Sequence, residues 1–115
     1  MTHTHNFPSA IRTPIGADEP LLLDNFSVVM PDDSMAPILV EGDRVFLDRS
    51  LTPRVGDVVL VADQLGEWWL RNYESAPDGS WQATAHASGY GPALMPSAGA
   101  VVVAVCDGTQ GRRAR

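Results

Sequence analysis

The hydroxyl group of Ser34 is the clearest candidate nucleophile of this chain. It lies in the segment DSMAP (residues 33–37), and a Gly42-Asp43 pair follows a few residues later. A serine hydroxyl attacks a carbonyl carbon only when a neighbouring group removes its proton. Lysine is one such base, but the chain contains none, because all eight of its Lys+Arg residues are arginine. The sequence therefore predicts a nucleophile position that lacks a common activator.

Other residues offer little as a replacement base. His3 and His5 lie near the N-terminus, and two histidines at i, i+2 with no third ligand nearby do not predict a metal site. His86 falls on or just after a predicted strand, where we expect a structural or surface role. Asp32 and Asp33 precede the serine, but a carboxylate with the ordinary pKa of about 4 is a poor base. We expect these two carboxylates to order the turn.

Short apolar runs separated by turn residues dominate the chain after residue 20. We expect strands over residues 26–30, 44–47, 58–61, 68–73, 81–85 and 101–106. Such spacing is typical of an all-β sandwich or open barrel. These strands and their turns must therefore position any site.

Glycines mark several of the expected turns. The pair Asp78-Gly79 separates two strand-like runs and predicts a hairpin with positive φ at its turn. Gly42 and Gly56 each precede an aspartate and then a β-branched or aromatic run, so we expect each to begin a strand.

Helical structure is expected only as a short turn after Ser34. There Ser34 would cap the following amide groups and Pro37 would lie in the first turn. No window places apolar residues at i, i+3, i+4 and i+7 over the roughly 11 residues that an amphipathic helix needs. The sequence therefore predicts no helix-turn-helix.

Aromatic residues gather in two of the expected strands. Trp68 and Trp69 are adjacent, so they point to opposite faces of one strand. One should join the core and the other should be half exposed. For the exposed ring, a protein interface and an ordinary surface position remain open, because tryptophan is enriched at interface anchors.

The length and composition indicate one small domain. The chain has 115 residues, 44% hydrophobic and 19% charged, with a net charge of -6. We expect a flexible arm or linker over residues 1–20, a folded domain over 21–108 and a disordered basic tail over 109–115. The acidic balance argues against direct nucleic-acid binding. One cysteine, no membrane span and no cofactor or metal motif predict a soluble cytoplasmic protein.

Three segments together resemble the LexA-like serine peptidases, which include phage-repressor C-terminal domains, UmuD-like proteins and the more distant signal peptidases. The segments are PDDSMAP (31–37), EGDRV (41–45) and VGDVVL (55–60), and the resemblance spans roughly residues 25–106. It implies strongly bent sheets that form a partly open barrel, with Ser34 at the nucleophile position. Supporting positions in these segments are Asp33, Met35, Pro37, Gly42, Asp43, Gly56 and Asp57.

The same resemblance places Arg71 where the family has its general-base lysine. The corresponding stretch is GEWWLRNY (66–73). Burial can lower the pKa of a lysine from about 10.4 to roughly 7 at a cost of about 5 kcal/mol. An equivalent shift of an arginine would cost on the order of 8 kcal/mol, which is comparable with the whole stability of a small domain. We therefore expect Arg71 to stay charged and to donate hydrogen bonds.

The substrate side also departs from the family pattern. LexA-like proteins usually cut an Ala-Gly or Cys-Gly bond in their linker, whereas the arm here has Gly16-Ala17. The only Ala-Gly pair is Ala98-Gly99, late in the expected domain. Together with the missing lysine, this order favours an inactive domain.

These features lead to one expected function and two alternatives. The expected protein is a pseudoenzyme of transcription regulation or the SOS response, which acts as a homodimer or binds a LexA-like repressor or a polymerase component. An exposed sheet edge and the strand at 101–105 would provide the pairing surface. The first alternative is an active serine peptidase, self-cleaving or acting in trans, with an unrecognised base. The second is a β-module in which Arg71 binds a carboxylate ligand.

Overall fold

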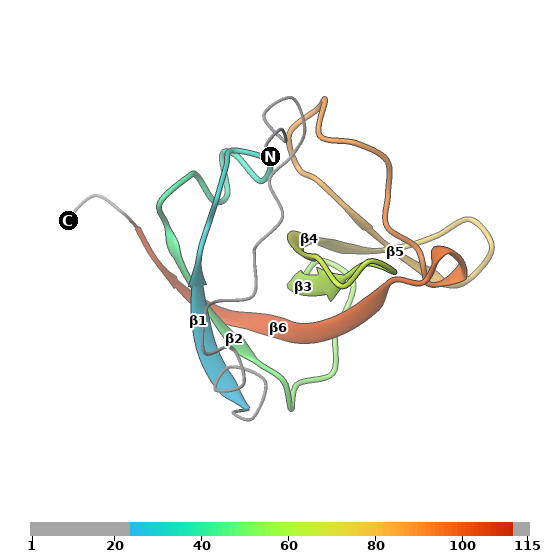
Figure 1. Cartoon of the computed structure of the whole chain (residues 1–115), viewed down its shortest axis with the longest axis horizontal. Coiled ribbons are helices and arrows are strands. Elements are labelled where there is room, and N and C mark those ends of the chain that lie inside the picture. The colour runs from blue at the N-terminus through green and yellow to red at the C-terminus, as the bar shows by residue number, and fades with distance from the viewer. Residues whose placement is uncertain (1–23, 112–115) are drawn as a thin grey trace.

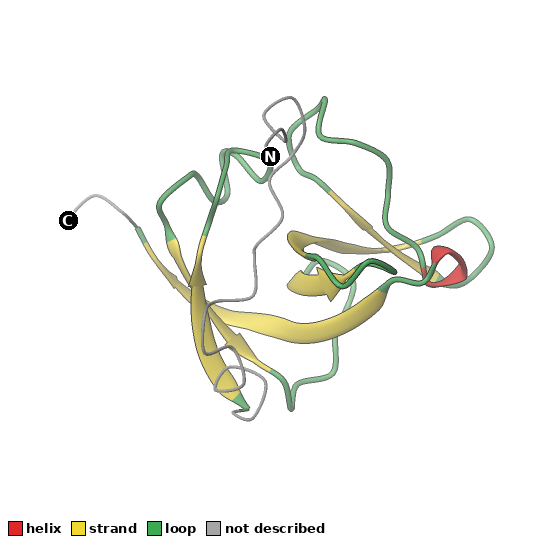
Figure 2. Cartoon of the chain, in the orientation of Figure 1, coloured by secondary structure: helices red, strands yellow, loops and turns green. Residues whose placement is uncertain are grey.

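The computed structural model of the chain describes residues 24–111, which form six antiparallel strands in one sheet. The elements are β1 (Asn25–Val29), β2 (Arg44–Asp48), β3 (Val58–Ala62), β4 (Trp68–Ser75), β5 (Trp81–Thr84), the 3-10 helix η2 (Pro96–Ala98) and β6 (Val101–Gln110). All six expected strands are present, and the all-β class is confirmed (Figure 2). The predicted arm at 1–20, with His3 and His5, lies outside the described residues, as does 112–115.

The strand order is β1-β2-β6-β3-β4-β5, which makes β6 a central strand. Its C-terminal half pairs with β2 and its N-terminal half pairs with β3, so it joins two groups of strands (Figure 1). Residues 101–105, which we expected to contribute to a pairing surface, pair with β3 on one side, and β2 joins the other side of β6 only from Val105 onward. The strand also continues to Gln110, two residues beyond the expected end of the domain.

Two irregularities in the pairing of β6 help to bend the sheet. The register shifts between Phe46 and Leu47 on the β2 side, and between Leu60 and Val61 on the β3 side. An extra residue on one strand increases the local twist and bends that strand. The sheet bends but, within residues 24–111, does not close into a barrel, because β1 and β5 are its two ends.

Buried side chains form two clusters. The first contains Met30, Met35, Leu47, Leu60, Trp68 and Leu70, among others. The second contains Val59, Val61, Ala83, Ala100 and Val105. Alternation along β4 sends Trp68 into the first cluster and leaves Trp69 half-buried, as predicted.

The turns follow the glycine pattern. A hairpin joins β4 and β5, with Gly79 at φ 89°, and this confirms the predicted Asp78-Gly79 turn. Gly42 and Gly56 have φ values of 94° and 99° and lie just before β2 and β3, which confirms both predicted strand starts. The helix η2 was not predicted, because a single turn that begins at Pro96 has no apolar period to detect.

No helix within residues 24–111 is long and apolar enough to cross a membrane.

Candidate functional site

Ser34 lies in the turn region between β1 and β2, and its side chain is fully buried. The backbone nitrogen of Ser34 donates a hydrogen bond to the Asp32 carboxylate at 2.9 Å. The amide of Leu39 donates to the carbonyl of Met35 at 3.0 Å, and these two side chains are also buried in the first core cluster. Burial of the flanking apolar residues therefore fixes the turn, and with it the position of the serine.

The local role predicted for Ser34 differs from the one observed. We expected its hydroxyl to cap the amide groups of a helical turn, but its oxygen accepts a hydrogen bond from Arg71 instead. Carboxylates take the backbone amides of this region: Asp32 binds the amide of Ser34, and Asp33 binds the amide of Glu41 at 2.9 Å. The aspartates order the turn, as the sequence predicts.

The two Gly-Asp pairs build the same kind of turn at the starts of β2 and β3. The Asp43 carboxylate accepts from the amide of Val40 at 2.9 Å, and the amide of Asp43 donates back to the carbonyl of Val40 at 3.0 Å. Asp57 repeats both contacts with Arg54, at 2.8 and 2.9 Å. These aspartates hold the backbone at the starts of β2 and β3.

Arg71 projects from β4 and meets Ser34 at the buried end of its side chain. Only 4% of Arg71 is exposed. Its Nη1 donates to the Ser34 hydroxyl oxygen at 3.0 Å and to the carbonyl oxygen of Leu70 at 2.8 Å. The structure therefore brings together the two residues that the sequence places at the nucleophile and general-base positions.

Trp69 holds the other side of the guanidinium. The Arg71 guanidinium carbon lies 5.2 Å from the centre of the indole ring, within the range of a cation–π contact. The indole nitrogen donates to the Asp63 carboxylate at 2.9 Å, which fixes the ring. The contact between Trp69 and Arg71 was not predicted, although residues at i and i+2 of a strand share a face.

The charge of Arg71 is set by opposing effects. Burial lowers the pKa of Arg71 from its ordinary value, because a low-dielectric surrounding disfavours the charged form. The nearby Asp32 and Tyr90 raise the pKa in the opposite direction. An arginine starts so far above neutral pH that it remains protonated in proteins. The group opposite Ser34 is therefore a permanent donor.

This arrangement cannot supply general-base catalysis from Arg71. A base must present a lone pair to the hydroxyl proton, whereas the Arg71 Nη1 presents a hydrogen to the serine oxygen. Ser34 is also fully buried, so its hydroxyl has no open surface for a substrate or a carboxylate ligand. The geometry suits a structural polar contact.

His86 contacts a residue other than Ser34. Its side chain is exposed, and its Nδ1 lies 3.5 Å from the side-chain Nδ2 of Asn72. The next residue, Ala87, donates its backbone amide to the carbonyl of Ser34 at 2.9 Å. This backbone contact ties the segment after β5 to the serine turn, and no sequence pattern predicted it.

The other positions considered from the sequence are a metal site, the single cysteine and the Ala-Gly pair. Within residues 24–111, no group of three or more His, Cys, Asp or Glu side chains could hold a metal ion. Cys106 is a free, half-buried thiol, and burial raises its pKa. Ala98 and Gly99, the only Ala-Gly pair, end η2, where a Cβ on Gly99 would come within 2.8 Å of the Cβ of Gln64.

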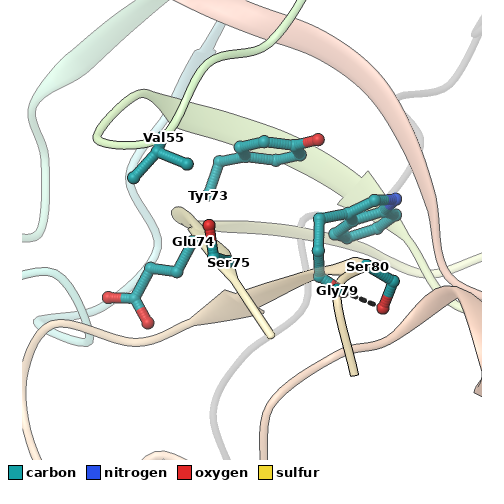
Figure 3. Close-up of a pocket in the computed structure, with 7 residues that line it drawn as sticks. Val55, Tyr73, Glu74, Ser75, Gly79 and Ser80 are labelled. Atoms are coloured by element: carbon teal, nitrogen blue, oxygen red, sulfur yellow. Dashed lines mark hydrogen bonds between the residues drawn. The ribbon is translucent and has the colours of Figure 1, made fainter. Parts of the chain in front are cut away.

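A separate hollow lies at the β4–β5 hairpin (Figure 3). Its volume is about 270 Å³, and Val55, Tyr73, Glu74 and Trp81 supply its larger side chains. The Tyr73 and Trp81 rings stack with centroids 5.5 Å apart. Neither Ser34 nor Arg71 lines it, so this hollow is distinct from the buried pair.

No protein-family model matches the chain, and no curated protein matches it significantly.

Proposed function

We propose that this chain is a LexA-like peptidase-fold domain without peptidase activity, which acts by self-association or by binding a repressor or SOS-type protein. The proposal includes a cytoplasmic location, with which a single unpaired cysteine is compatible. The three sequence segments around Ser34, Gly42 and Gly56 support the family resemblance, and the all-β sheet agrees with it.

One observation carries the inactive assignment. Arg71 Nη1 donates a hydrogen bond to the hydroxyl oxygen of Ser34, 3.0 Å away, in a fully buried contact. A lysine at this position can lose its proton when buried, and arginine cannot. The hydroxyl of Ser34 therefore faces a hydrogen-bond donor at the position proposed for the base, and Arg71 offers it no proton acceptor.

The proposal is tested by following the intact mass of the purified chain during long incubation between about pH 7 and 10, the range in which a buried lysine base would act. We expect no change in the parent, in Ser34→Ala, or in the control Ser80→Ala, whose serine is exposed. Cleavage of the parent and of Ser80→Ala that is abolished in Ser34→Ala would establish an active peptidase with another base. Cleavage of all three would identify a contaminating protease.

A further inference from the structure

The outer edge of β1 carries backbone groups that no strand within residues 24–111 covers. β1 and β5 are the two ends of the sheet. β5 is bridged on its outer side, because Ala83 and Leu94 exchange two backbone hydrogen bonds of 2.8 Å. β1 has a described partner on its inner side only, which is β2.

The hydrogen bonds between β1 and β2 show which backbone groups of β1 point away from β2. The Met30 amide donates to the carbonyl of Asp43 at 2.8 Å, and the Arg49 amide donates to the carbonyl of Asp24 at 2.7 Å. Even-numbered residues of this segment therefore direct their backbone groups toward β2. Because the direction alternates along a strand, Asn25, Ser27 and Val29 direct theirs to the outer edge.

The sequence of β1 does not protect this edge. Proteins usually block an edge strand with charge, proline, a bulge or a covering segment. The strand reads NFSVV, with no charged residue, proline or glycine, and its pairing with β2 has a continuous register. Asn25 and Val29, at its two ends, are both exposed.

Charge on the neighbouring strand favours a second copy of this chain as the occupant. In the β1–β2 register, Val29 lies opposite Arg44 and Asn25 lies opposite Asp48. If two copies met with antiparallel β1 strands centred on Ser27, Val29 of one copy would pair with Asn25 of the other. The row of residues across the four strands would then begin with Arg44 beside Val29 in one copy and end with Asp48 beside Asn25 in the other. A parallel pairing in register would instead align like charges.

The outer face beside the edge provides apolar surface for the same contact. Phe46 lies opposite Ser27 and is 38% exposed, and Val29 is 47% exposed. A hollow of about 460 Å³ is lined in part by Asn25, Ser27 and Phe46. Antiparallel pairing would bring Val29 of the second copy opposite Asn25, at the rim of this hollow.

We propose that two copies of this chain pair antiparallel through β1, with the two-fold axis at Ser27, to form one continuous sheet. The inference rests on the associative part of the proposed function and is independent of the state of Ser34. Main-chain hydrogen bonds from Asn25, Ser27 and Val29 provide the contact, and the opposite charges of Arg44 and Asp48, about 14 Å apart, add a weak preference for the antiparallel direction.

Single cysteines test this register in a Cys106→Ala background. A hydrogen-bonded pair on the two-fold axis has Cα atoms about 5.5 Å apart, within the range of a disulfide. Ser27→Cys should therefore form a covalent dimer under mild oxidation. The two copies of the cysteine in Val29→Cys would lie roughly 14 Å apart along the strand. This matched variant should therefore form at least tenfold less covalent dimer than Ser27→Cys. A mixture of Asn25→Cys and Val29→Cys should crosslink, whereas neither variant should crosslink alone.

Charge at the axis provides a second test without oxidation. Ser27→Lys and Ser27→Asp should each dissociate the dimer in sedimentation experiments, because like charges meet at the axis, and an equimolar mixture should restore it. A monomeric parent at all concentrations, or equal crosslinking of Ser27→Cys and Val29→Cys, would overturn the pairing. A parent dimer that Ser27→Lys leaves intact would also overturn it, while the proposed association would stand. Failure of the inactive assignment would appear only as Ser34-dependent cleavage.

Discussion

The structure contains two arginine–serine side-chain hydrogen bonds of equal length, one in the interior and one on the surface. Arg71 donates to Ser34 at 3.0 Å, and Arg44 donates to Ser27 at 3.0 Å. Arg71 is 4% exposed, whereas the contact of Arg44 is open to water. The donor, the acceptor and the distance match, so the two pairs differ in burial and in the further contacts of Arg71 with Leu70 and Trp69.

Burial changes the consequence of losing each bond. A buried donor or acceptor that loses its partner keeps the cost of desolvation, about 1–3 kcal/mol, whereas a surface group exchanges its partner for water. No buried side-chain nitrogen or oxygen within residues 24–111 lacks a hydrogen-bond partner. The interior pair is therefore a fixed part of the fold, and the surface pair is replaceable.

The largest effect should come from removing the two arginines in parallel. Arg71→Ala leaves Ser34 without its donor, removes the contact with Trp69 and opens space in the interior, so we expect a loss of about 3 kcal/mol in the free energy of unfolding. Arg44→Ala should cost less than about 0.5 kcal/mol. Denaturant unfolding at one low protein concentration measures both. Equal losses would show that burial does not distinguish the pairs.

An intermediate effect is expected from the two serines. Ser34→Ala removes one acceptor from a buried guanidinium and should lower the free energy of unfolding by about 1–2 kcal/mol. Ser27→Ala leaves Arg44 in water and should change it by less than about 0.5 kcal/mol. Thermal and denaturant unfolding of the two variants provide the comparison, and a neutral Ser34→Ala would contradict a structural role for the buried bond.

The smallest effect should be a pH dependence introduced by lysine. Arg71→Lys keeps a cation near Ser34, and burial lowers the pKa of that lysine. The folded state then binds fewer protons than the unfolded chain, so the free energy of unfolding should rise as the pH increases toward about 10. Arg44→Lys should show no such rise, since an exposed lysine keeps its ordinary pKa of about 10.4. Denaturant unfolding of both variants between about pH 7 and 10 measures the difference, and a flat profile for Arg71→Lys would contradict the buried base position.

The strands and their turns could be predicted because their determinants are local. Gly42, Gly56 and Gly79 adopt the positive φ of their turns without steric cost, and the β-branched and aromatic runs between them favour strands. The meeting of Ser34 and Arg71 was anticipated only through the family resemblance. Composition alone could not have placed a turn before β2 against a residue on β4.

The features that the sequence did not reveal depend on long-range pairing. Strand order places β6 between β2 and β3, and no local pattern in the sequence predicts this position. Ser34 is another example. Its sequence neighbours favour a helix-capping hydrogen bond, but the fold places Arg71 beside it, and Arg71 becomes the partner of its hydroxyl. The backbone contact from Ala87 to Ser34 leaves no residue-type signal, because any non-proline amide could donate it.

The central position of β6 has a consequence for biosynthesis. The β1–β2 hairpin and the β3–β4–β5 meander have no strand pairing with each other, and β6 supplies pairing to both. A ribosome synthesises β6 after all the other strands. Until it emerges from the exit tunnel, the two groups of strands share contacts such as that between Arg71 and Ser34 but no strand pairing, and β6 then completes the sheet.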